Sequence, residues 1–452
     1  MERTNTFIVE NSPALWELAD NCARLWNEFN FERRQAYIHY RKFSWYPKHF
    51  YEKYAPLIGS ATAQEIINKN NEAWRSFLAL KRLEAKGNLP SHIEKVSMPR
   101  YWKRNGRRDL RIIIRKDCYK MDGKYVHLPK GLRLRWKGCL KWRGKQGRLE
   151  IIYDDADEVW RGFMVVEVEK PPIRGGNKPL YIDLGVRCLA TIWYKGMKQQ
   201  IAFRGGELLW DWWYWTRKIA KEQSRLARVN KIRASRKLRK LYRIRQRRFR
   251  HAVNAMIKWI VKYAHQSGLS KIVVGNLKGI RENNHKNAKA NSMIHNFWSF
   301  KWIIQRLKGK AEEYGIEVVE VSEHRTSSIC PRCGSNKTVR RGRLFKCLNC
   351  GLEAHRDVVG VINMGTLHDG GMPIRLVAQP LLLRWNRMRW EPKRAMSIRP
   401  MNTLEARISP LKRESVKVRF LYMVCRVAER SSMFLSGYAY FIETLKVLCC
   451  FV

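Results

Sequence analysis

The stretch Cys330-Pro-Arg-Cys333, followed by Cys347-Leu-Asn-Cys350 and then by Asp357, contains two CxxC pairs separated by 13 residues. Two CxxC pairs at this spacing are typical of a zinc ribbon. Four thiolates fill the tetrahedral shell of Zn²⁺ and leave no position open for water or substrate. The cysteines therefore predict one structural Zn²⁺, and any chemistry has to lie elsewhere in the chain.

Asp357 is the first candidate for that chemistry, and Asp183 is its most obvious partner. Asp183 stands in Pro179-Leu-Tyr-Ile-Asp-Leu-Gly-Val186, an apolar run that carries one carboxylate and then a glycine, as expected of a buried strand. A strand aspartate brought close to a distant aspartate suggests divalent-metal chemistry on phosphate. We therefore predict that the two carboxylates share a metal site.

The charge of the chain indicates which kind of phosphate compound it binds. It has 90 Lys and Arg against 39 Asp and Glu, a formal net charge of +51 over 452 residues. Such an excess repels itself unless a polyanion neutralises it, so nucleic acid is the expected partner. A merely soluble basic protein is the alternative, and the interleaving of the positive charges with Trp and Tyr argues against it.

Cysteine usage and the chain ends predict the compartment. Seven of the 11 cysteines lie outside the ribbon without paired spacing, except the terminal two, and no charged-then-apolar leader is seen at the N-terminus. These features predict a reducing, intracellular location, in the cytoplasm and associated with the nucleoid. The apolar end, residues 433–452, is interrupted by Glu443 and Lys446, which argues against a membrane span.

The sequence pattern of the N-terminal third changes twice, from strand-like to helical and back to strand-like. After a strand-like start at residues 6–9, Asn11-Ser12-Pro13 predicts a helix start, and a helical subdomain follows to about Ala85. Residues 97–171 then contain short branched or alternating runs between Gly, Pro and charged turns, which predict strands. We interpret this third as a small β-barrel with a helical insertion.

The second half begins with three predicted strands at residues 180–184, 189–194 and 199–203. Three meandering strands with an aspartate on the first are how an RNase H-like fold begins. The phosphate loop of actin-like and sugar-kinase ATPases also contains an apolar-Asp-x-Gly pattern. That alternative predicts a second glycine-rich loop and an adenosine motif, and no zinc ribbon.

Residues 212–250 form a long predicted helical stretch that is dominated by Arg and Lys. Between Arg217 and Arg250 only Glu222 is acidic, and like charges spaced four apart destabilise an isolated helix. We therefore predict that this stretch contacts RNA or DNA. The candidate phosphate-binding residues are Arg228, Lys231, Arg236, Arg239, Arg243 and Arg247.

The order of these motifs resembles one known family. Five segments carry the resemblance: Tyr181-Ile-Asp-Leu-Gly-Val186, Ile272-Val-Val-Gly-Asn-Leu-Lys-Gly-Ile280, Thr326-Ser-Ser-Ile-Cys-Pro-Arg-Cys-Gly334, Cys347-Leu-Asn-Cys-Gly351 and His355-Arg-Asp-Val-Val-Gly-Val-Ile-Asn363. Together they resemble TnpB, also called OrfB, the RNA-guided nucleases of insertion sequences. These proteins were long described as transposases and are related to type V CRISPR effectors.

The resemblance implies a multidomain α/β fold and a function. It divides the chain into a wedge-like β-barrel (1–10 and 96–172), a helical recognition lobe (11–95), a RuvC-type, RNase H-like nuclease domain (178–325 and 353–365), the zinc ribbon (326–352) and a poorly structured extension (366–452). The implied activity is cleavage of guide-matched double-stranded DNA beside a short motif. The implied cofactors are one structural Zn²⁺ and two catalytic Mg²⁺, and the guide RNA comes from the same element. The oligomeric state stays open.

One departure from the family affects the catalytic prediction. The family's RuvC site uses Asp, Glu and Asp, and its Glu ends the fourth strand in a segment such as Val-Glu-Asp-Leu. Here that segment is Val274-Gly-Asn-Leu277, and glycine cannot bind metal. Glu323 is the best replacement, because it follows the strand that neighbours the fourth in an RNase H-like sheet; Glu282 is second.

Several functions therefore remain open for the chain. The leading expectation is a nuclease whose catalytic residues are Asp183, Glu323 and Asp357. The main alternative is an RNA-guided DNA-binding protein that has lost cleavage, with Gly275 as its mark, or an accessory protein in transposition. A DNA-rejoining transposase is the weaker third, because no tyrosine nucleophile stands in a His-hydrophobe-His setting.

Overall fold

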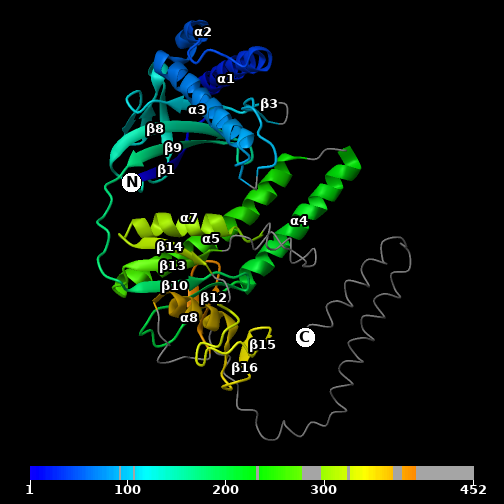
Figure 1. Ribbon diagram of the computed structural model, residues 1–452. Coiled ribbons are helices and arrows are strands. Elements are labelled where there is room, and N and C mark those ends of the chain that lie inside the picture. The colour runs from blue at the N-terminus through cyan, green and yellow to red at the C-terminus, as the bar shows by residue number, and fades with distance from the viewer. Residues whose placement is uncertain are drawn as a thin grey trace, which may run out of the picture. The chain divides into compact units, whose positions relative to one another are not determined.

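The computed structural model describes residues 1–90, 93–104, 107–230, 234–276, 297–322, 326–369 and 379–392. Two seven-stranded sheets and a three-stranded sheet organise this part of the chain (Figure 1). No helix among the described residues has both the length and the apolar character that a membrane span requires.

The N-terminal sheet is antiparallel and has the strand order β4-β8-β9-β1-β7-β6-β5. Its strands are β1 (Glu2–Val9), β4 (Arg111–Ile114), β5 (Lys120–Asp122), β6 (Tyr125–His127), β7 (Arg133–Lys137), β8 (Lys145–Asp154) and β9 (Val159–Glu167). A short β2–β3 hairpin (Lys103–Arg104 and Arg107–Arg108) precedes β4, and a 3-10 turn (Pro129–Gly131) precedes β7. The predicted strands of this region are confirmed. The described residues show no pairing between the edge strands β4 and β5.

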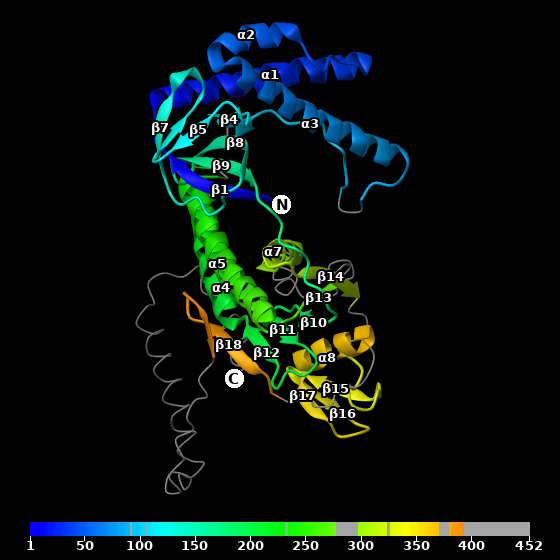
Figure 2. The ribbon, with the colours of Figure 1, turned by 90° about the vertical axis from the view of Figure 1, so that its left-hand side faces the viewer.

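Three helices share a hydrophobic core with this sheet: α1 (Pro13–Tyr40), α2 (Lys48–Ile58) and α3 (Ser60–Ala85) (Figure 2). Helix α1 begins at Pro13, as predicted, because proline at the first helical position presets the backbone angle. Leu15, Leu18, Cys22 and Phe29 are buried on one face of α1, as their helical spacing predicts. The helical insertion expected after the first strand is thus present.

The second sheet has the strand order β14-β13-β10-β11-β12-β18-β19. Its first five strands in sequence are β10 (Pro179–Asp183), β11 (Cys188–Trp193), β12 (Ile201–Arg204), β13 (Lys271–Asn276) and β14 (Glu317–Ser322). Strand β10 pairs antiparallel with β11 and parallel with β13, which pairs parallel with β14. The strand that carries Asp183 is therefore central in the sheet.

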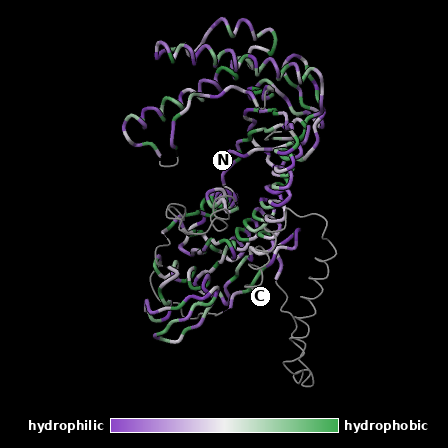
Figure 3. Tube along the Cα trace, turned by 90° about the vertical axis from the view of Figure 1, so that its right-hand side faces the viewer, coloured by the Kyte–Doolittle hydropathy of each residue, from purple (hydrophilic) through white to green (hydrophobic). Residues whose placement is uncertain are grey.

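Helices α5 (Arg236–Gln266), α7 (Phe300–Glu312) and α8 (Arg356–Asp369) pack into the core of this sheet. Helix α4 (Gly206–Asn230) packs against α5. The prediction of one helical stretch at 212–250 is wrong in this respect, because the basic residues belong to two helices. Helix α5 changes from mostly hydrophilic to mostly hydrophobic along its length (Figure 3), and only its second half is buried beside the sheet.

Two corrections concern the chain beyond residue 365. Helix α8 continues to Asp369, and residues that we expected to be poorly structured form β18 (Leu381–Trp385) and β19 (Trp390–Pro392). Strand β18 pairs in parallel with β12, where the apolar run Leu381-Leu-Leu383 covers an otherwise open sheet edge. Residues 393–452 lie outside the described part.

Candidate metal and nucleic-acid sites

Asp183 lies at the end of strand β10, directly after four buried residues. Its carboxylate faces helix α8: a Cβ placed on Gly360 would lie 2.9 Å from Asp183 Oδ2. A side chain at position 360 would therefore displace this carboxylate. Glycine lets α8 approach the strand end and brings the carboxylates of Asp183 and Asp357 into one site.

Asp357 lies in the first turn of α8 and is held by the zinc-ribbon segment. Arg343 Nη1 donates to both of its carboxylate oxygens, at 2.6 and 2.5 Å. Burial, followed by the charge of Asp357, raises the pKa of Asp183 to about 7, whereas Arg356 and Arg343 act in the opposite direction. A buried carboxylate whose proton affinity is raised by a neighbouring carboxylate is a favourable place for a divalent cation.

The third carboxylate is missing where the family places it. Strand β13 pairs with β10 up to Ile182 and Val274, so Gly275 comes level with Asp183 on the neighbouring strand. Gly275 in turn pairs with Val321 of β14, which confirms that the strand before Glu323 neighbours β13. Glu323 and Glu282 lie outside the described residues, and the role of Glu323 stays a prediction.

Two further side chains that could bind a metal, neither of them among the residues predicted for the site, lie beside Asp357. The donor atoms of Cys188, His355 and Asp357 lie within 4.8 Å of one another. Burial lowers the pKa of His355, which favours the neutral ring, and His355 Nδ1 is buried with no hydrogen-bond partner in the described part of the chain. The spacing His-x-Asp could have suggested His355, whereas Cys188 is found only once β11 is folded against β10.

The four predicted zinc ligands also come together. The Sγ atoms of Cys330 and Cys350 lie 3.6 Å apart, as do those of Cys333 and Cys347. A tetrahedral Zn²⁺ with bonds of about 2.3 Å would separate its sulfurs by about 3.8 Å, so the four thiols fit this ion. Hydrogen bonds from the backbone N–H of Ser335 and from the Asn349 side chain lower the pKa of Cys333 to about 6, which favours a thiolate ligand.

The ribbon fold is a three-stranded sheet that links the metal ligands to the carboxylate pair. It consists of β15 (Thr338–Arg341), β16 (Leu344–Cys347) and β17 (Glu353–His355), and β17 leads directly into α8. Arg343 lies in the turn between β15 and β16. The arginine that binds Asp357 is therefore positioned by the β15–β16 hairpin, whose opposite end carries Cys347.

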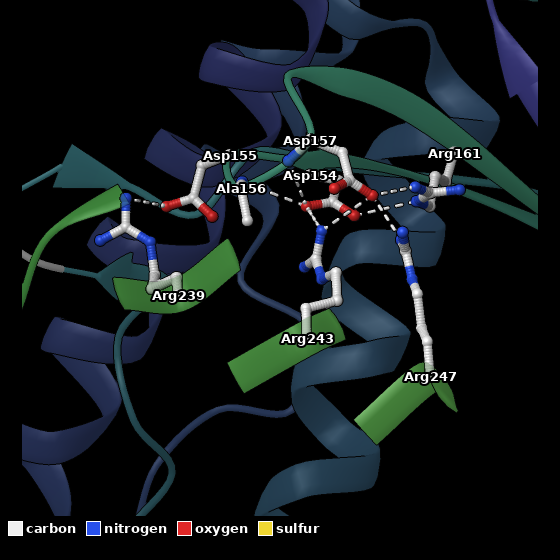
Figure 4. A network of polar contacts seen from close by, with 8 residues as sticks. All are labelled: Asp154, Asp155, Ala156, Asp157, Arg161, Arg239, Arg243 and Arg247. Atoms are coloured by element: carbon white, nitrogen blue, oxygen red, sulfur yellow. Dashed lines mark hydrogen bonds and ion pairs between the residues drawn. The ribbon is translucent and has the colours of Figure 1, made fainter. Parts of the chain in front are cut away.

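The predicted nucleic-acid residues meet carboxylates of the chain itself. We call residues 154–158, which connect β8 to β9, the acidic turn. The arginines that pair with it from one side of α5 form what we call the arginine row, namely Arg236, Arg239, Arg243 and Arg247. Figure 4 shows the last three of them with the aspartates of the acidic turn.

The contacts of the row are specific and partly buried. Arg239 lies 3.1 Å from Asp155, and Arg243 pairs with both Asp154 and Asp157. Arg161 of β9 holds the same two aspartates, at 2.9 and 2.5 Å. The prediction of an arginine face open to phosphate therefore has to be amended, because each arginine of the row already has a carboxylate partner. Arg228 is exposed, and Lys231 lies outside the described residues.

We expect a triple change of Arg236, Arg239 and Arg243 to Gln to lower the thermal unfolding midpoint without changing the salt dependence of nucleic-acid binding. Three lost phosphate contacts would instead flatten the log–log salt slope by about 2 to 3. Melting curves and salt titrations of binding distinguish these results. Arg228→Gln is the matched control for an exposed arginine, and a flattened slope at an unchanged midpoint would contradict the intramolecular role.

The acidic turn should also make stability depend on pH. Burial alone would raise the pKa of Asp154, but hydrogen bonds from Arg243 and Arg161 outweigh it and lower the pKa to about 2. Because the folded pKa is below the ordinary value, this contribution is complete above about pH 4 and is lost as the pH falls toward 2. Asp154→Asn should remove about 2 kcal/mol of stability at pH 7, as measured by denaturant unfolding.

Comparison with known proteins identifies relatives of the chain. Residues 163–281 match a family described as "Probable transposase", and residues 300–364 match the Cas12f1-like TNB domain. A TnpB-like protein, ORF457 of Acidianus two-tailed virus, is 32% identical over 391 residues, which cover 77% of this chain and 82% of that protein. The CRISPR-associated endodeoxyribonuclease Cas12f1 of Sulfoacidibacillus thermotolerans is 25% identical over 224 residues, covering 46% of this chain and 50% of that protein.

Solved structures with a similar trace include a Cas12f1–sgRNA–target DNA complex. It covers 77% of this chain and 81% of that chain, at 16% identity and a TM-score of 0.45.

Proposed function

Because the chain belongs to the TnpB family, also called OrfB, we propose that it is an RNA-guided, divalent-metal-dependent DNA endonuclease encoded by a transposable element. The observation that carries the proposal is the meeting of Asp183 and Asp357 at the end of the central strand of the second sheet. The relatives of the chain include an endodeoxyribonuclease. Guide RNA and double-stranded target DNA are the partners proposed for this chain.

The strand order supports an RNase H-like, RuvC-type nuclease domain. In that fold the aspartate strand is flanked on one side by two strands of an antiparallel meander and on the other by two parallel strands. Strands β11 and β12 lie on one side of β10, and β13 and β14 lie on the other. We therefore propose that residues 178–325 and 353–365 form this domain around the inserted ribbon.

Asp183 and Asp357 would hold the catalytic Mg²⁺, which when bound activates water and stabilises the leaving oxygen of a phosphodiester. The raised proton affinity of Asp183, to which the charge of Asp357 contributes, fits a site for a cation. Arg343 would orient Asp357, because it donates to both carboxylate oxygens. Glu323 completes the proposed set, while Cys188 and His355 are further donors within reach of Asp357.

The alternative function is RNA-guided DNA binding without cleavage. Gly275, level with Asp183, favours it, because no carboxylate can come from that strand position. The proposed structural Zn²⁺ and the nucleic-acid partners would be the same in both functions. The two candidate functions therefore differ only in whether the metal site can support cleavage of DNA.

The decisive experiment uses the full chain purified with the RNA made from its own locus. We expect cleavage of a DNA library that carries a matched target, in the presence of Mg²⁺ or Mn²⁺ and not of EDTA. Tight and specific target binding without metal-dependent cleavage would establish the alternative. If the chain shows no guided binding and no cleavage, both functions are contradicted.

A further inference from the structure

A pocket of about 710 Å³ lies away from the carboxylate pair, between the first turns of α4, the middle of α5 and the turn from β18 to β19. Pockets of a few hundred Å³ and more are large enough for a small organic ligand. Most of the aromatic residues that line this pocket come from the segment Trp210-Asp-Trp-Trp-Tyr-Trp215. The third wall, which includes Trp385 and Arg387, exists only because β18 and β19 join the sheet.

Two aromatic side chains of this pocket are exposed. Trp210 is 73% exposed and Tyr214 is 46% exposed, although large aromatic side chains normally bury most of their surface. They lie four residues apart on α4, and hence on the same face of the helix. Trp212 is different, because it packs edge-on against Phe249 and Phe297 at 6.0 and 5.3 Å and forms the floor.

The charges around these rings are mostly positive. Arg248 is paired with Asp211, with contacts of 2.7 to 3.0 Å, so these two charges cancel. Arg245 lies over the Trp212 ring at 4.0 Å and donates to Thr216, with no carboxylate partner among the described residues. Arg217 and Arg387 are exposed at the rim, and no ion pair is seen for either within the described ranges.

Exposed aromatic rings beside unpaired arginines are the chemistry that binds single-stranded nucleic acid. Every base can stack on a flat ring, and flanking phosphates are held by arginine, independently of base sequence. A purely apolar partner would leave Arg217 and Arg387 without counter-charges. A duplex would keep its bases stacked and away from the rings.

We propose that this pocket binds an unpaired nucleotide of single-stranded nucleic acid, with its base stacked on Trp210 and Tyr214 and its phosphates beside Arg217 and Arg387. This inference rests on the proposed function only in taking nucleic acid as the partner. The strand can come from the guide RNA or from opened DNA, since both offer a base and a phosphate backbone. The pocket does not depend on the competence of the carboxylate pair.

The test uses the full chain and short single-stranded RNA and DNA oligonucleotides that contain 2-aminopurine, whose fluorescence is quenched when it stacks. We expect the wild type to quench the fluorescence of the oligonucleotide. Trp210→Ala should lower the affinity for the oligonucleotide, measured by this quenching, by about 5- to 150-fold, which is the usual range for the loss of one stacked base. Trp210→Phe should retain quenching, because it keeps a ring. Because Trp210 is exposed, the alanine variant should fold like the wild type. Arg387→Gln is a second variant, which should flatten the log–log salt slope of oligonucleotide binding by about 0.7.

Quenching of RNA alone would assign the guide as the source, and quenching of DNA alone would assign an opened target strand. Undiminished quenching in the Trp210→Ala, Tyr214→Ala double variant, or equal quenching of a duplex, would overturn the proposal. Asp183→Ala should quench like the wild type. If the wild type quenches the oligonucleotide but shows no guided cleavage, the nuclease function is contradicted and the nucleotide-binding role of the pocket is not.

Discussion

Replacing Asp183 by alanine should abolish guided DNA cleavage and leave target binding nearly intact. The carboxylate lies half-buried at the end of β10, against Gly360 and near Asp357, where the proposed function assigns it to the metal site. A metal ion in such a site stabilises the transition state by several kcal/mol, so we expect a loss of about 10³-fold or more in the cleavage rate. Single-turnover cleavage and equilibrium binding, measured on the same preparation, check both halves of the prediction.

Glu353→Gln is the matched control for removal of a carboxylate near this site. Glu353 lies on β17, is exposed and pairs with Lys346 at 2.7 Å, outside the carboxylate pair. Its cleavage rate should equal that of the wild type. An Asp183→Ala chain that cuts as fast as the wild type would show that the catalytic assignment is wrong.

Glu323→Gln addresses the third metal ligand. A loss of cleavage comparable to that of Asp183→Ala would support Glu323 as the replacement for the missing carboxylate. Wild-type cleavage by this variant would exclude it, and His355→Ala would then test whether the imidazole beside Asp357 supplies the third ligand. Metal titration by calorimetry with each variant separates loss of metal affinity from loss of folding.

Replacement of Cys347 by serine should remove Zn²⁺ and unfold residues 326–352. The small core of this segment is built largely from the cysteines themselves, together with Phe345, Leu352, Ala354 and Val359. Structural Zn²⁺ sites in small domains contribute roughly 10 to 16 kcal/mol of binding free energy, which the apolar core cannot replace. We expect metal content to fall from about one Zn²⁺ per chain and nucleic-acid binding to weaken.

The same change should also impair cleavage in any chain that still binds DNA. Arg343 reaches Asp357 from the turn between β15 and β16, so unfolding of the ribbon removes this contact. Cys139→Ser, a change of an exposed cysteine outside the ribbon, is the control. About one tightly held Zn²⁺ per chain in the Cys330→Ser, Cys333→Ser double variant would rule out the four-cysteine site.

Much of the fold could be predicted from the sequence because its signals are local. An apolar run such as Leu180–Ile182 predicts a buried strand, and proline at position 13 predicts a helix start. The CxxC pairs specify their own metal site, since four ligands at fixed spacing close on one ion. The sequence also predicts one shared site for Asp183 and Asp357.

The tertiary structure alone decided which partners the charged and exposed side chains meet. Arg243 and Asp154 are 89 residues apart in sequence, and nothing local in a basic helix reveals whether its counter-charge is a phosphate or a carboxylate. In the same way, the proximity of Cys188 and His355, and the wall that β18 and β19 add to the aromatic pocket, depend on pairings between distant strands. Sequence periodicity fixes which face a residue occupies on its own element, whereas long-range contacts depend on how those elements pack.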